Sequence, residues 1–136
     1  MDLLRMDPDT LLHRVRERLP ALLAFYAFGS RIDGTAGPDS DLDLAVLVAG
    51  YADPLELWTL SGELADLAGC PVDLLDLRAA STVMQYRILT TGRCCWARDA
   101  SVAIYEAGIL SDKTELDTAR AGLLADIVER GSIHGR

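Results

Sequence analysis

The chain has 136 residues, half of them hydrophobic, which is enough for one domain with a packed core. Acidic residues outnumber basic ones by 21 to 13, and the formal net charge is −8. This charge argues against nucleic acid as the main partner, because phosphate backbones are bound by basic surfaces, and it fits a basic protein partner better. With no leader-like apolar segment, no run of about 18 apolar residues and no zinc spacing among the three cysteines, we expect a cytoplasmic protein that binds no membrane.

Helical and strand-like segments alternate along the chain. Apolar residues recur at helical spacing in several segments, whereas the run over 22–28 is almost wholly apolar, as in a strand buried on both faces. The expected elements are a helix over 8–19, a strand over 22–28, a strand over 41–48, a helix over 55–67, a strand over 72–77, a helix over 80–89, a strand over 93–97, and helices over 99–109 and 111–130. This order predicts an α/β fold, a small mixed sheet with flanking helices, in one domain over 1–136 with its core at about 20–97.

A pair of carboxylates, Asp41 and Asp43, begins the second expected strand. Residues two apart on a strand share a face, so both carboxylates should point the same way. Such a pair repels itself unless a cation compensates, and Mg²⁺ takes carboxylate oxygen together with substrate phosphate. We choose Asp73 as the third carboxylate, because it comes early in its strand and would lie nearby if that strand runs parallel. Asp76 would then end the strand or face solvent.

A Gly-Ser turn, Gly29-Ser30, follows the first expected strand. Glycine lets backbone N–H groups approach a phosphate closely, and the Ser30 hydroxyl can donate one more hydrogen bond. A short helix beginning at Ser30 would add a positive helix end. Arg31 and Ser40, the first and last of the ten residues between this turn and Asp41, are further candidates for nucleotide binding. The layout predicts a site for a metal-bound nucleoside triphosphate.

This order of motifs resembles the signature of the DNA polymerase beta-type nucleotidyltransferase superfamily: Gly-Ser, ten residues, Asp-x-Asp, and then a carboxylate on a later strand. The spelling FGSR…GPDSDLDLAV is similar to its minimal nucleotidyltransferase (MNT) branch, which includes antitoxin partners of HEPN-domain toxins. The resemblance runs from about residue 22 to residue 96. The sequence departs from many relatives at Asp33-Gly34, where they have Arg-Gly.

The resemblance implies roles for these residues. The Gly-Ser turn would bind the triphosphate, the three aspartates would hold Mg²⁺, and Asp73 could help to activate the attacking hydroxyl. It also implies transfer of AMP from ATP to a hydroxyl, expected to be a tyrosine, of a cognate HEPN toxin, which makes the chain an antitoxin of a type VII system. ATP itself is implied by the family alone.

Several alternatives stay open at this point. The chain could neutralise its partner by binding alone, or it could modify a small molecule, as aminoglycoside nucleotidyltransferases do, although little of the chain is left for a substrate domain. Arg87 and Arg93 could reach a phosphate, but an exposed ion pair is the more common fate of such residues. Trp58 is expected to pack beside the apolar stripe of its helix.

Overall fold

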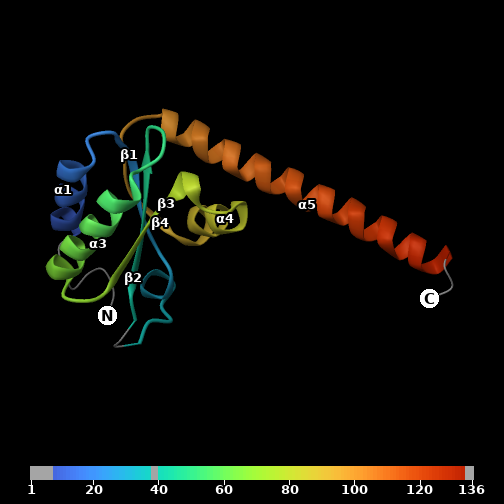
Figure 1. Cartoon of the computed structure of the whole chain (residues 1–136), viewed down its shortest axis with the longest axis horizontal. Helices are drawn as coiled ribbons and strands as arrows, with labels where there is room; N and C mark the ends of the chain where they lie inside the picture. The colour runs from blue at the N-terminus through green and yellow to red at the C-terminus, as the bar shows by residue number, and fades with distance from the viewer. Residues whose placement is uncertain (1–7, 38–39, 134–136) are drawn as a thin grey trace.

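A four-stranded sheet with helices on both faces forms the body of the molecule (Figure 1). The computed structural model describes residues 8–37 and 40–133, so the expected helix cap at Asp7 lies outside the described residues. The elements in chain order are α1 (Pro8–Arg18), β1 (Leu22–Phe28), α2 (Ser30–Asp33), β2 (Leu42–Val48), α3 (Pro54–Ala68), β3 (Val72–Asp76), the 3-10 helix η2 (Leu77–Ala79), α4 (Thr82–Thr91), β4 (Arg93–Ala97) and α5 (Ser101–Ile133).

The sheet is mixed, which confirms the predicted fold class. Its strand order is β3-β2-β1-β4; β1 is antiparallel to β2 and β4, whereas β2 and β3 are parallel. A parallel β2–β3 pair is what the choice of Asp73 required, because it brings the first residues of both strands to the same end of the sheet. Within the described residues, no helix combines the length and apolar character needed to cross a membrane.

The strand side chains alternate between two hydrophobic layers. Phe25 and Ala27 of β1 belong to the layer formed with α1 and α3, and Tyr26 and Phe28 belong to the layer formed with α4 and α5. Figure 1 shows these two pairs of helices on opposite sides of the sheet. Both faces of β1 and β2 are therefore covered, which explains why their sequences are nearly continuous apolar runs.

The C-terminal segment is one helix of 33 residues, α5, and the prediction of two helices meeting near residue 110 was wrong. The segment has no proline, and Gly108 costs only about 1 kcal/mol inside a helix. At the expected break, Thr114 Oγ1 donates to the Leu110 carbonyl at 3.0 Å, and one turn further on Lys113 Nζ lies 2.6 Å from Asp117 Oδ2. The far half of α5 projects away from the sheet (Figure 1).

Trp58 lies elsewhere than expected, whereas Asp76 ends its strand as one of its two alternatives predicted. Trp58 is 80% exposed, because the residues that α3 turns toward the sheet are its neighbours Leu57 and Leu60. Asp76 ends β3 but is only 8% exposed, since its carboxylate accepts hydrogen bonds from the backbone N–H groups of Ala52 and Arg78. Cys94 is exposed on the edge strand β4.

Candidate active site

Asp43 lies at the centre of the candidate site, against the turn that follows β1. In the sheet it pairs with Phe28 of β1 on one side and with Asp73 of β3 on the other. Gly29 has φ 80° and ψ −162°, a backbone conformation that is essentially restricted to glycine. A Cβ atom at this position would collide with Oδ2 of Asp43 and stand 3.0 Å from its Cγ. The glycine therefore leaves room for the Asp43 carboxylate.

The three predicted carboxylates come together at one end of one sheet face. Asp43 lies two residues before Ala45 on β2, and Asp73 lies two residues before Leu75 on β3. Residues two apart on a strand share a face, so both aspartates belong to the face that α4 and α5 cover. Asp41 precedes the first residue of β2 and is exposed. Burial raises the pKa of Asp43, and the negative charges of Asp73 and Asp41 raise it further. Asp73 and Asp41 are thus each close enough to Asp43 to repel its charge.

This donor set fits a hard divalent cation. Carboxylate oxygens are the protein ligands that Mg²⁺ takes together with substrate phosphates, and a cation would offset the repulsion at Asp43. In the described parts of the chain, no three acidic, histidine or cysteine side chains are already gathered around one ion position. Binding an ion would therefore require the exposed Asp41 and Asp73 carboxylates to turn toward it.

The loop after Gly29 is held in place by its own hydrogen bonds. A helix does begin at Ser30, but α2 has only four residues. Arg31 is 6% exposed, and its Nε and Nη2 donate to the Ser40 carbonyl at 3.0 and 2.6 Å. The Ser40 hydroxyl accepts from the Gly37 N–H at 2.8 Å. The structure gives Arg31 and Ser40 a part in fixing the loop, and their contact with a nucleotide stays a prediction.

Arg87 is exposed on α4, which covers the same sheet face as the carboxylates. Burial and two neighbouring carboxylates raise the pKa of Asp43, and the charge of Arg87 acts in the opposite direction. Hydrogen bonds from Thr35 lower the pKa of Asp33 at the end of α2, and Arg87 lowers it further. Arg87 is therefore near enough to act on the charges of Asp43 and Asp33, which the sequence left undecided, because its position depends on how α4 crosses the sheet.

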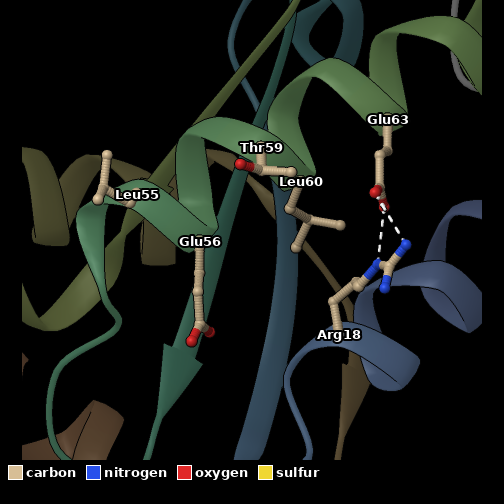
Figure 2. A pocket seen from close by; sticks show the side chains of 6 residues that line it. All are labelled: Arg18, Leu55, Glu56, Thr59, Leu60 and Glu63. Atoms are coloured by element: carbon tan, nitrogen blue, oxygen red, sulfur yellow. Dashed lines mark hydrogen bonds and ion pairs between the residues drawn. The ribbon is translucent and has the colours of Figure 1, made fainter.

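A hollow of about 500 Å³ lies between α1 and α3 (Figure 2). Its lining residues are Leu55, Glu56, Thr59, Leu60 and Glu63 of α3 and Arg18 of α1. Arg18 Nε and Nη2 each donate to a carboxylate oxygen of Glu63 at 2.9 Å, which links the two helices. Because α1 and α3 cover the face of the sheet opposite to Asp43, this hollow is separate from the carboxylate site.

Comparisons with known proteins agree on one family. The family described as "Polymerase beta, Nucleotidyltransferase" matches residues 12–101, which include the Gly29 turn and all three aspartates. Protein adenylyltransferase MntA of Shewanella oneidensis is 31% identical over 124 residues, which are 91% of this chain and 89% of that protein. A crystal structure of a toxin–antitoxin with AMP-PNP has a TM-score of 0.80 and 31% identity, over 90% of this chain and 99% of that one.

A further similar structure contains a modified toxin. It is a tri-AMPylated HEPN toxin of Shewanella oneidensis in complex with an MNT antitoxin. The TM-score is 0.72 at 29% identity, over 88% of this chain and 94% of that chain. The resemblance that rested on a few motif residues thus extends over most of the chain.

Proposed function

Because this chain belongs to the polymerase beta nucleotidyltransferase family, we propose that it transfers AMP from ATP to a hydroxyl group, expected to be a tyrosine, of a cognate HEPN-domain toxin and so acts as its antitoxin. The observation that carries the proposal is the pairing of Asp43 with Asp73 at one end of the sheet, beside the Gly29 turn and near enough to Asp41 for its charge to act on Asp43. The similarity to complexes of HEPN toxins supports the choice of acceptor.

In this proposal each residue has a chemical task. Asp41, Asp43 and Asp73 hold Mg²⁺, which when bound neutralises phosphate charge and aligns the reacting groups. The backbone at Gly29 and the Ser30 hydroxyl donate hydrogen bonds to phosphate oxygens. The acceptor oxygen bonds to the α-phosphorus, the bond to the β-phosphate oxygen breaks, and pyrophosphate leaves. Asp73, which lies at the exposed side of the site, accepts the hydroxyl proton.

We propose that the C-terminal part of α5 forms the surface that binds the toxin. Its side chains over residues 117–125 are all exposed, and Leu123 and Leu124 are 60% and 61% exposed. A projecting helix of this kind is marginal in water by itself, so a partner that covers the two leucines would stabilise it. The toxin is the occupant that fits, because similar toxin–antitoxin structures match up to 90% of this chain and the net charge of −8 favours a basic protein.

The setting that fits this proposal is the cytoplasm, where ATP and a toxin made in the same cell are both present. All three cysteines are free, as expected of a reducing compartment.

Labelled ATP tests the reaction. The protein and its cognate HEPN toxin are incubated with Mg²⁺ and with ATP that carries ³²P at either the α or the γ position. We expect label on the toxin from the α position alone, and none from an Asp41→Asn/Asp43→Asn double variant that still binds the toxin. Label from the γ position would indicate phosphoryl transfer instead, and an unlabelled toxin in a tight complex would indicate neutralisation by binding alone.

A further inference from the structure

We propose that Arg87 of α4 binds the terminal phosphates of the nucleotide and stabilises the leaving pyrophosphate. This inference rests on the proposed function and adds a residue on a different element from the Gly-Ser turn and the aspartates. Three features of the described residues support it: where α4 crosses the sheet, which charges Arg87 faces, and the absence of a competing partner.

The C-terminal half of α4 lies against the end of β1 that leads into Gly29. A Cβ on Gly92, directly after α4, would stand 2.8 Å from the Ala27 carbonyl and 3.1 Å from Phe28 Cβ. Ile88 is fully buried in the same layer as Phe28. Arg87 precedes this buried residue and is exposed, so its side chain projects from the layer into solvent, on the sheet face that also carries Asp43.

The charge of Arg87 acts on two carboxylates that flank the turn. One is Asp43, whose carboxylate occupies the space that a Cβ atom on Gly29 would fill. The other is Asp33, the last residue of α2. Because its charge acts on both groups, the Arg87 guanidinium lies near the Gly29-Ser30 turn, on the side of the sheet where α4 packs. The triphosphate proposed to bind there would meet Asp33, and Arg87 would offset the repulsion between that carboxylate and the phosphates.

Within the described residues, the Arg87 guanidinium forms no hydrogen bond or ion pair. Arg31, by contrast, is buried and bound to the Ser40 carbonyl. A guanidinium offers paired N–H donors that match phosphate oxygens, and such charge-assisted bonds are stronger than neutral ones. Arg87 is therefore the better-placed phosphate ligand of the two.

Arg93 provides a matched control. It is also exposed and lies at the same end of the sheet, one residue after Gly92. In the sheet it pairs with Ala27, a member of the layer formed with α1 and α3, so it belongs to the opposite face from Asp43. Replacing Arg93 changes the net charge as replacing Arg87 does, but without removing a group from the proposed site.

Calorimetric titration with AMP-PNP and with AMP, in the presence of Mg²⁺, tests the assignment without requiring turnover. We expect Arg87→Gln to weaken AMP-PNP binding by about 10- to 100-fold, the usual effect of losing a charge-assisted hydrogen bond, and to leave AMP binding nearly unchanged. Arg87→Lys should fall between the parent and Arg87→Gln, because lysine keeps the charge but loses the paired donors. Arg93→Gln should bind both ligands as the parent does.

The outcomes separate this inference from the function on which it rests. If Arg87→Gln binds AMP-PNP as tightly as the parent, or loses AMP and AMP-PNP affinity equally, the Arg87 assignment is overturned whatever the transfer assay shows. If Arg87→Gln weakens AMP-PNP binding as expected but the parent never labels the toxin, the proposed function fails, while the assignment of Arg87 as a phosphate ligand stands. A parent that binds no AMP-PNP would overturn both.

Discussion

Replacing Gly29 with alanine tests how closely the turn and the metal site depend on each other. The backbone there, at φ 80° and ψ −162°, lies in a region that costs a residue with a side chain about 1–3 kcal/mol. The new Cβ would also collide with the Asp43 carboxylate, and forcing that side chain out of its rotamer adds about 0.5–1.5 kcal/mol. Together these give a loss of about 1.5–4.5 kcal/mol in the free energy of unfolding. Because Asp43 is displaced, AMP-PNP binding should also be lost.

Gly50→Ala is the matched control, since Gly50 also has a positive φ of 78° but a Cβ there would meet nothing within 4 Å. It lies just after β2, at the other end of that strand from Asp43. We expect this control to lose only about 1–2 kcal/mol and to bind AMP-PNP normally. Urea unfolding and calorimetry of both variants provide the comparison. The reasoning is refuted if Gly29→Ala matches Gly50→Ala in stability and retains AMP-PNP binding.

Three other changes have defined outcomes. Asp43→Asn removes a repelled charge whose pKa is raised by burial and by its neighbours, so in metal-free buffer at neutral pH the free energy of unfolding should rise by about 0.5–2 kcal/mol while transfer is lost. This gain should vanish below about pH 4, where the unfolded carboxyl is protonated too, and lower stability at neutral pH would contradict the account. Tyr26→Phe removes the bond from the buried hydroxyl to Glu106, 2.7 Å long, and should cost about 1–3 kcal/mol at neutral pH. Burial and Glu106 also raise the pKa of Tyr26, so its stabilising contribution should fall above about pH 10, where an unfolded tyrosine ionises; urea unfolding at neutral and alkaline pH would refute this if parent and variant declined equally. Leu123→Asp/Leu124→Asp should weaken the complex with the toxin by more than about tenfold in a pull-down titration and leave AMP-PNP binding intact, whereas an unchanged complex would exclude this surface.

The strands were predictable because their apolar runs are bounded by residues that break regular structure. Leu22–Phe28 ends at Gly29, and the bounds of β4 were predicted to the residue. The same reasoning placed Asp73 beside Asp43 on the condition that their strands run parallel, which they do. The neighbouring positions of Asp43 and Asp73 could therefore be predicted from the sequence, whereas their role as metal ligands stays a prediction.

The features that the sequence did not predict depend on how helices and strands pack against each other. The spacing of apolar residues indicated two final helices, but it cannot show that Gly108 is tolerated inside one long helix. Trp58 was expected to pack because it lies beside the apolar stripe of its helix, yet the sheet contacts another face of α3. Arg87 could not be assigned to the site until the path of α4 over the sheet face was known, because no local motif marks it.

Intact-mass spectrometry of the toxin tests the central claim most directly, with toxin activity measured in the same samples. The toxin is incubated with Mg²⁺, ATP and either the parent or the Asp41→Asn/Asp43→Asn double variant. The account predicts that the parent adds one or more AMP groups and silences the toxin, whereas the double variant does neither. A toxin that gains no mass from the parent, yet is silenced equally by both proteins, would contradict it.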